Sequence, residues 1–221
     1  KLFIMKITCI SDTHNQHLHI PPFWLEGGDV LVHAGDVSGR GTLKEIEAFW
    51  EWFNDQPYKH KIMIAGNHDF WFEKVSSFAV RELLQEKYPN VTYLNDSGVE
   101  IDGIKFWGSP VQPWFYDWAF NRVGAEIIPH WDMIPLDTDV LITHGPAKGY
   151  LDYTLRGVST GCPYLLEKIS KLTNLKLFVC GHIHEAYGQV DFPDGGVFVN
   201  ASTLNFNYNV QNKPIVIEVK K

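Results

Sequence analysis

Five short motifs in this chain carry side chains that can bind metal ions, and each motif directly follows an apolar run. Together they supply two aspartates, one asparagine and four histidines, with one further histidine among them. Two divalent ions that share a bridging carboxylate need such a set, and a metal pair of this kind supports in-line displacement at phosphorus. The motifs are Asp12-Thr13-His14, Gly35-Asp36, Gly66-Asn67-His68-Asp69, His144-Gly145-Pro146 and Gly181-His182-Ile183-His184.

Two of the motifs place a pair of ligands one residue apart. On an extended segment Asp12 and His14 face the same way, and so do His182 and His184. Asp36 has two carboxylate oxygens and can therefore bridge two ions, which a histidine or an amide does less well. Taken singly, each motif also fits an ordinary turn or helix cap. Only the ordered set of five predicts a metal centre.

The Asn-His pair suggests a division of roles within that centre. Asn67 offers a neutral oxygen ligand, which leaves the site positively charged. His68 would lie beside the ions without binding one, and there it can donate a proton to a leaving alkoxide. Nitrogen and oxygen ligands without thiolate favour Mn, Fe, Zn, Co or Ni. Such an ion lowers the pKa of its bound water to about 7.

Runs of Val, Ile and Leu between Gly, Asp or Asn predict strands buried on both faces. Helices are expected between them, the first with a capping box of Thr42 and Glu45. This alternation indicates a layered α/β fold, in which ligands collect at the carboxyl ends of strands. The expected strands are Met5–Ile10, Val30–Ala34, Lys61–Ala65, Lys105–Trp107, Val140–Thr143, Leu175–Cys180, Gly196–Val199 and Pro214–Val219. The expected helices are Thr42–Asn54, Ser76–Lys87 and Pro163–Leu172.

Length and composition predict one domain, residues 1–221, with a sizeable core. The net charge of −7, without a Lys/Arg cluster beyond Lys220-Lys221, disfavours nucleic acid as a partner. A small phosphorylated substrate is compatible with this charge, because the positive charge of bound metal outweighs it locally.

No apolar stretch is long enough to span a membrane, and the residues before Met5, a candidate native start, are too few for a signal sequence. Three cysteines without pair spacing fit a reducing cytoplasm.

Two segments are longer than a connection between elements requires, which is typical of functional loops. Gly108–Asn121 is rich in aromatic residues, and its Trp114 can stack on a base or ring of the substrate. The alternative is that these aromatic side chains pack the loop onto the core. Gly145–Cys162 carries Arg156, which joins Trp114 as a candidate substrate-binding residue.

The ordered motifs resemble those of the calcineurin-like metallophosphoesterases over nearly the whole chain. The resemblance implies an α/β sandwich of two facing mixed β-sheets flanked by helices, with two divalent ions for which Mn or Fe is favoured. It also suggests a homodimer. His68 receives the role of assisting the leaving group, with Asp36 and Asn67 as the other catalytic residues. The implied ligands are Asp12, His14, Asp36 and His184 for one ion, and Asp36, Asn67, His144 and His182 for the other.

Further stretches resemble a narrower subgroup, the metallophosphoesterase-domain proteins related to class III cyclic-nucleotide phosphodiesterases. Two departures from the wider family stand out. Many relatives have Glu where Asp69 stands, and the protein-phosphatase branch has an Asp at Gly39 that orients the catalytic histidine. The Arg that follows is present as Arg40 and can touch phosphate. The subgroup stretches are Tyr58-Lys59-His60-Lys61 leading into Ile64-Ala65-Gly66-Asn67-His68, Gly108-Ser109-Pro110, Pro113-Trp114-Phe115, Arg156-Gly157, Gly161-Cys162, and Gly181-His182-Ile183-His184-Glu185 continuing to Tyr187-Gly188.

The favoured function is a phosphodiesterase, with cyclic nucleotides among its candidate substrates, in which a metal-bridging hydroxide attacks phosphorus in line. The first alternative is a phosphomonoesterase acting on a small phosphate ester or nucleotide, since the metal ligands are the same for both. The second is a non-catalytic metal-binding scaffold. A scaffold would be expected to have lost ligands, whereas all seven positions are filled here.

Overall fold

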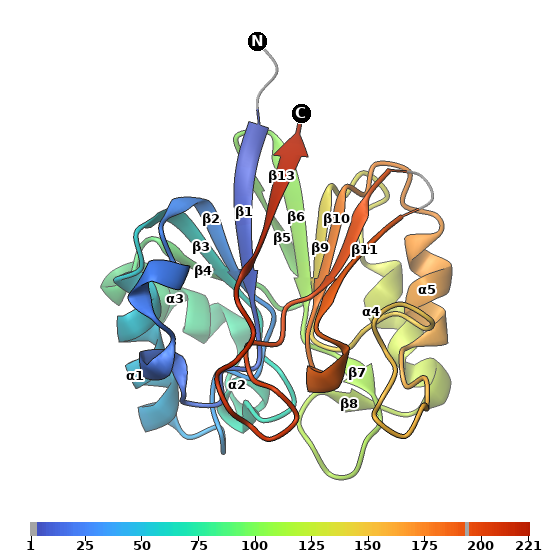
Figure 1. The fold of residues 1–221 in the computed structure, drawn as a ribbon, viewed down its shortest axis with the longest axis horizontal. Helices are drawn as coiled ribbons and strands as arrows, with labels where there is room; N and C mark the ends of the chain where they lie inside the picture. The colour runs from blue at the N-terminus through green and yellow to red at the C-terminus, as the bar shows by residue number, and fades with distance from the viewer. Residues whose placement is uncertain (1–3, 193–194) are drawn as a thin grey trace.

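Two β-sheets face each other at the centre of the molecule, and helices cover the outer face of each sheet (Figure 1). The computed structural model describes residues 4–192 and 195–221. The two described ends of the chain lie together at the top of Figure 1, on β1 and β13. The expectation that Met5 is the native start concerns residues 1–4, of which residues 1–3 lie outside the described residues.

The first sheet holds five strands in the order β13-β1-β2-β3-β4. Its four N-terminal strands run parallel, and β13 pairs antiparallel with β1 at the edge, with Ile7 opposite Ile217. Parallel neighbours bring their carboxyl ends to the same edge of the sheet. The strands are β1 (Ile4–Ile10), β2 (Gly28–His33), β3 (Tyr58–Met63), β4 (Val91–Tyr93) and β13 (Ile215–Lys220).

The second sheet holds six strands in the order β11-β12-β10-β9-β6-β5. Its four central strands are parallel, and both edge strands are antiparallel to their neighbours. The strands are β5 (Ser97–Ile101), β6 (Ile104–Ser109), β9 (Val140–Thr143), β10 (Leu177–Cys180), β11 (Gly188–Asp191) and β12 (Val197–Asn200). A separate two-stranded ribbon pairs β7 (Gln112–Pro113) with β8 (Asn121–Arg122).

Helices of the first half of the chain cover the first sheet, and helices of the second half cover the second (Figure 1). Helix α1 begins after the expected capping box, in which Thr42 accepts from the Glu45 amide and Glu45 accepts from the Thr42 amide. The first group is α1 (Leu43–Asn54), α2 (Phe70–Lys74) and α3 (Ser77–Lys87), and the second is α4 (Ile128–Asp132) and α5 (Pro163–Ile169). Short 3-10 turns occupy His17–His19, Pro22–Trp24, Gly124–Ile127 and His184–Ala186.

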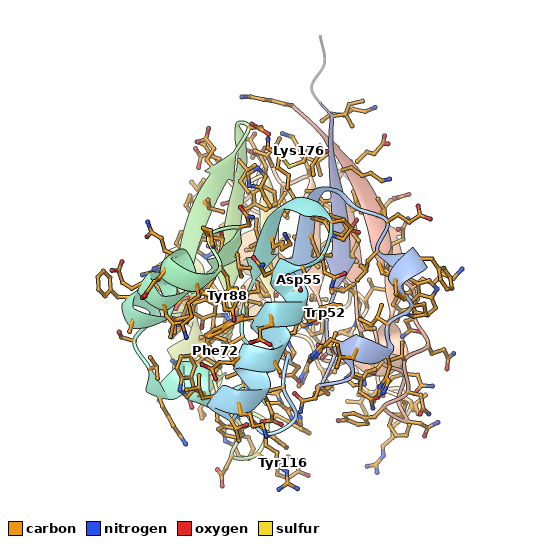
Figure 2. All side chains as sticks on the ribbon, turned by 90° about the vertical axis from the view of Figure 1, so that its left-hand side faces the viewer. Trp52, Asp55, Phe72, Tyr88, Tyr116 and Lys176 are labelled. Atoms are coloured by element: carbon orange, nitrogen blue, oxygen red, sulfur yellow. The ribbon has the colours of Figure 1, made fainter. Side chains whose placement is uncertain are left out.

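The core has three layers, one between the sheets and one beneath each group of helices. Val32 and Val179 lie in the central layer, where both are fully buried. Helix α1 buries Phe49 and Trp50 against the first sheet (Figure 2 shows this side of the molecule). Each fully buried aliphatic or aromatic side chain contributes about 1.5–3 kcal/mol of transfer free energy. These layers hold the strand ends, and therefore the loops beyond them, in fixed positions.

All eight predicted strands are present, with ends that differ by up to three residues, and the predicted helices are confirmed. The elements that the sequence analysis missed are short or lie at sheet edges. In β5, for example, half-buried and exposed residues alternate from Ser97 to Glu100, so the strand lacks a continuous apolar run. Among the helices of the described residues, none combines the length and apolar character that crossing a bilayer requires.

Candidate metal centre

The five predicted motifs lie in the loops that directly follow β1, β2, β3, β9 and β10. All five strands run towards the lower end of Figure 1: β1, β2 and β3 are parallel to one another in the first sheet, and β9 and β10 are parallel in the second. Three strands come from the first sheet and two from the second. The motifs therefore meet across the gap between the sheets, where ligands in open α/β folds bind.

The structure brings the seven predicted ligand side chains together. Asp36 is central, because its Oδ2 lies 3.6 Å from Nε2 of His14 and 3.3 Å from Nε2 of His144. Asn67 Oδ1 lies 2.9 Å from the same nitrogen of His144. Besides a group that includes His68, two groups made of predicted ligands present ligand atoms that all lie within 4.8 Å of one another. They are Asp12 with His14 and His184, and Asp36 with His144 and His182.

Backbone carbonyl groups fix the tautomers of three of these histidines. Nδ1 donates to the carbonyl of Ser38 in His14 (3.2 Å), of Ala34 in His144 (2.9 Å) and of Asn205 in His184 (3.1 Å). A neutral ring that donates from Nδ1 has its lone pair on Nε2, which here points at the carboxylates. Such hydrogen bonds orient metal-binding histidines in general.

Hydrogen bonds from neighbouring groups fix the orientation of both carboxylates, Asp36 and Asp12. Oδ1 of Asp36 accepts from the His68 amide at 2.8 Å, which leaves Oδ2 facing the histidines. Asp12 accepts from the His182 amide, at 3.1 and 3.0 Å to its two oxygens, and from Ser202 Oγ at 2.8 Å. Each carboxylate is thus oriented before any ion binds.

Burial and the two carboxylates set the charge of the centre. Burial lowers the pKa of both His14 and His182 to about 4, so these rings are neutral at pH 7. Burial also acts to lower the pKa of His144, but the charge and hydrogen bond of Asp36 outweigh it and raise the value to about 9. Burial acts to raise the pKa of Asp36, but the charge and hydrogen bond of His144 and the charges of other nearby histidines outweigh it. The pKa of Asp36 therefore lies well below its usual range. Histidine must be deprotonated to bind an ion, so binding at His144 releases a proton.

Several features show that these residues fit divalent ions. Nε2 of His14 is buried and has no hydrogen-bond partner, so a polar ligand atom is free. A Cβ on Gly66 would lie 2.2 Å from Asp36 Oδ1, and a Cβ on Gly181 would lie 2.1 Å from Asp12 Oδ2. The backbone must therefore approach both carboxylates closely, which only glycine permits. Four ligand residues adopt positive φ, a strained conformation that tends to mark functional sites. They are Asp12, His14, Asp36 and His182.

His68 lies beside the ligands, as predicted, and two groups orient its ring. Nδ1 donates to the carbonyl of Gly39 at 2.9 Å. The indole of Trp118 stacks on the ring, with centroids 4.1 Å apart and an angle of 29°. At position 39 a backbone carbonyl therefore does what a carboxylate side chain does in the protein-phosphatase branch.

Asp69 ties together the loops that carry Asp36 and Asn67. It is fully buried, and it accepts from the amides of Ser38 (3.0 Å) and Gly66 (2.8 Å) and from Ser38 Oγ (2.6 Å). Burial, reinforced by the charge of Asp36, raises its pKa to about 6. The sequence analysis noted Asp69 only as a departure from the family pattern. Its place two residues after a predicted ligand was the available signal for this bracing role.

A cavity of about 750 Å³ borders the candidate metal-binding side chains. Trp114 lines it, as expected of a substrate-binding residue, and is 57% exposed. Arg40 and Arg156 are exposed and lie outside the set of lining residues, so their contact with substrate stays a prediction. Residues of the C-terminal loop, Phe206 and Tyr208, also line the cavity and were missed. That loop follows β12, a neighbour of β10, so its position at a strand end was the only sequence signal.

The loop Gly145–Cys162 is organised around one buried carboxylate. Asp152 is fully buried, and its Oδ2 accepts from the amides of Gly149 (2.9 Å) and Gly161 (3.0 Å) as well as from the hydroxyl of Ser159. All three donors belong to the same loop. Thr154 and Thr160 bring this loop to the cavity.

Residues 5–186 match the sequence model of a family described as calcineurin-like phosphoesterase. The chain belongs to this family. The human metallophosphoesterase domain-containing protein 1 is 40% identical over 235 residues, which cover 97% of this chain and 71% of the relative. The UPF0046 protein K07C11.7 of Caenorhabditis elegans is 36% identical over 227 residues, covering 98% and 76%.

Solved structures of similar fold agree with this calcineurin-like phosphoesterase architecture. The protein TT1561 of Thermus thermophilus has a TM-score of 0.64 at 12% identity, covering 90% of this chain and 89% of its own. A dimetal phosphatase from Danio rerio has a TM-score of 0.52 at 11% identity, covering 89% and 86%. At such identities the likeness shows the fold alone. Family membership makes the chain a metal-dependent phosphoesterase and confirms both the resemblance and the expected sandwich.

Proposed function

We propose that this phosphoesterase hydrolyses phosphodiesters by in-line displacement at phosphorus, with Mn or Fe as the favoured ions. One observation carries the preference for diesters. Among the described residues that line the cavity, none is Lys or Arg. A phosphodiester has one negative charge and a monoester has up to two, so a site whose positive charge comes from metal alone suits the diester better.

The net charge of the centre supports the same choice. Two divalent ions would bring four positive charges; Asp12 and Asp36 would remove two, and the hydroxide nucleophile a third, so the one charge left matches the single negative charge of a diester. When bound, the ions would supply Lewis acidity towards the phosphoryl oxygens and an activated water molecule. The ligands that would hold them are the seven side chains described above.

His68 is the residue of the chain that acts on the leaving group in this proposal. A ring nitrogen of His68 lies within 4.8 Å of ligand atoms of His14 and Asp36, so the ring borders the place where phosphorus would lie. With Nδ1 held by the Gly39 carbonyl, Nε2 of the protonated ring can donate to the departing ester oxygen.

The test is turnover of bis(4-nitrophenyl) phosphate beside 4-nitrophenyl phosphate, on protein stripped of metal and reloaded with Mn²⁺. We expect a higher kcat/KM for the diester and loss of both activities in Asp36→Ala. A preference for the monoester would refute the proposal in favour of a phosphomonoesterase. Cyclic nucleotides, which the subgroup resemblance suggests, are the first natural diesters to screen.

A further inference from the structure

Four large aromatic side chains that line the cavity are left half exposed. Core aromatic residues such as Trp50 and Trp131 are buried almost completely, and exposed phenyl rings such as Phe23 and Phe78 lie outside the cavity. Four half-exposed aromatic side chains leave on the order of 300–500 Å² without a partner, and apolar patches of that size are often functional. They are Trp114 (57% exposed), Phe115 (48%), Phe206 (56%) and Tyr208 (48%).

These side chains, here called the aromatic rim, come from two loops on opposite sides of the ligands. Trp114 and Phe115 belong to the β7–β8 loop, and the Phe115 ring lies 6.1 Å from that of His182. Tyr208 belongs to the loop between β12 and β13, and its ring lies 5.0 Å from that of His184. Both loops lie at the lower end of Figure 1, and Tyr116, next to Phe115, marks that end in Figure 2.

The backbone holds Tyr208 in a strained conformation that packing against the core does not require. Its φ is +59°, which is costly for a bulky residue. Its carbonyl accepts from Gln16 Nε2 at 3.0 Å, and its amide donates to the carbonyl of Asn205 at 2.9 Å. The same Asn205 carbonyl accepts from Nδ1 of His184. The loop is therefore fixed to a metal-ligand candidate, and the Tyr208 ring is oriented towards the cavity.

The charges around the rim argue against a second phosphate on the substrate. Among the described lining residues, none is cationic apart from the histidines of the metal centre. Glu185 is a lining residue, and its Oε1 is held by the Leu155 amide at 2.9 Å. A carboxylate at this position repels an anionic substituent.

We propose that the aromatic rim binds one ester group of the phosphodiester, and that this group is a planar ring without a second phosphate. The inference rests on the proposed phosphodiesterase function and names its substrate class. A nucleobase and a simple aryl group share the required chemistry. Stacking on aromatic side chains is worth about 1–3 kcal/mol per ring, so each rim residue should change affinity by roughly 5- to 150-fold.

The test uses diesters that share 4-nitrophenol as the leaving group and differ only in the second ester group: methyl, cyclohexyl, phenyl, a nucleoside or phosphorylated ethyl. A common leaving group keeps the bond that breaks the same, and dividing kcat/KM by the uncatalysed hydrolysis rate of each diester removes the effect of the second group on phosphorus, so the remaining differences report the rim. We expect phenyl to exceed methyl and cyclohexyl by about tenfold or more, chiefly through KM. The nucleoside arm tells whether a base binds as well as a simple aryl group.

Rim variants and matched surface variants identify the residues responsible. In Trp114→Ala and Phe206→Ala we expect the phenyl-to-methyl ratio to fall towards one. Phe23→Ala and Phe78→Ala also remove exposed phenyl rings, but they lie outside the cavity and should leave the ratio unchanged.

Three outcomes would overturn the inference. They are a phenyl-to-methyl ratio near one in the unaltered protein, equal preference for cyclohexyl and phenyl, and preference for the phosphorylated ester with loss of that preference in Arg156→Gln. If no diester is turned over, the proposed function fails, but the rim is still tested by binding. Calorimetry should then show diphenyl phosphate binding at least tenfold more tightly than dimethyl phosphate, and equal affinities would refute the rim separately.

Discussion

Gly181→Ala should weaken metal binding by about 100-fold or more, because it displaces one carboxylate. A methyl group at this position would lie 2.1 Å from Asp12 Oδ2 and 2.1 Å from Ser11 Oγ. Ordinary contacts of a Cβ begin near 3.4 Å, so the carboxylate would have to move by about 1.3 Å. Asp12 cannot make that shift and keep its hydrogen bonds to the His182 amide and Ser202.

The expected loss follows from comparable disturbances. Removing a group that merely orients a ligand lowers metal affinity by about 10- to 100-fold, and a misplacement of about 1 Å lowers catalysis by about 100-fold. Displacing a ligand itself should lower both the metal affinity and the catalytic rate by at least about 100-fold. Mn²⁺ affinity would be measured by calorimetry, and kcat/KM with bis(4-nitrophenyl) phosphate.

Gly145→Ala is the matched control, because Gly145 also adjoins a histidine of the centre. There the nearest side-chain atom, Gln112 Cβ, lies 3.4 Å from the added methyl, so Mn²⁺ affinity should stay close to that of the unaltered protein. Circular dichroism checks that both variants fold. Unchanged Mn²⁺ affinity in folded Gly181→Ala would refute the assignment of Asp12 as a ligand held by close backbone approach.

Three further predictions concern other parts of the chain. His68→Asn should keep two ions but lower kcat by about 10²- to 10⁴-fold, most for poor leaving groups; an equal effect on all leaving groups, measured across substituted phenyl esters, would contradict the proton-donor role. Thr42→Ala breaks the capping box and should lower the free energy of unfolding by about 1 kcal/mol in urea titrations, with kcat/KM unchanged. Burial lowers the pKa of His33 from its usual value near 6.5 to about 3. The unfolded chain therefore binds a proton at His33 more tightly than the folded chain does, so the free energy of unfolding falls as the pH drops from 6.5 towards 3. At pH 5 the loss is about 2 kcal/mol, and His33→Gln should remove that part of the pH dependence in paired urea titrations at pH 7 and pH 5.

The metal-ligand candidates could be predicted because each directly follows a run of apolar residues. Strand ends of parallel sheets converge, so residues as far apart in the sequence as Asp36 and His144 were expected to meet. Both sheets bear this out, and the resemblance supplied their facing arrangement. The residues that orient the ligands were harder to find in the sequence: Asp69 offered only its place two residues after Asn67, and Ser202 acts on Asp12 through a contact between distant segments.

The orientation of His68 shows a second limit. A sequence reveals side chains, so the missing carboxylate at Gly39 looked like a gap in the pattern. The structure fills it with the carbonyl of the same residue, which every amino acid carries, and with Trp118 from another loop. For the aromatic residues of Gly108–Asn121, each of the two alternatives holds for part of the loop. Phe120 packs into the core, whereas Trp114 and Phe115 line the cavity.

The self-contained loop around Asp152 has a consequence for diversification. That carboxylate accepts only from donors within residues 149–161, and the segment meets the rest of the site through two hydrogen bonds to residues that are not ligand candidates, from the Leu155 amide to Glu185 and from Asn200 to the Leu151 carbonyl. We call this segment a cassette, because it can be exchanged without touching a ligand candidate directly. The other two borders of the cavity are bonded to ligand candidates themselves, since the Asn205 carbonyl accepts from His184 and the Ala119 amide donates to the carbonyl of Asn67 at 3.1 Å. Selection or laboratory evolution for new substrates should therefore accumulate insertions and replacements in the cassette, while changes at the other two borders also alter metal retention.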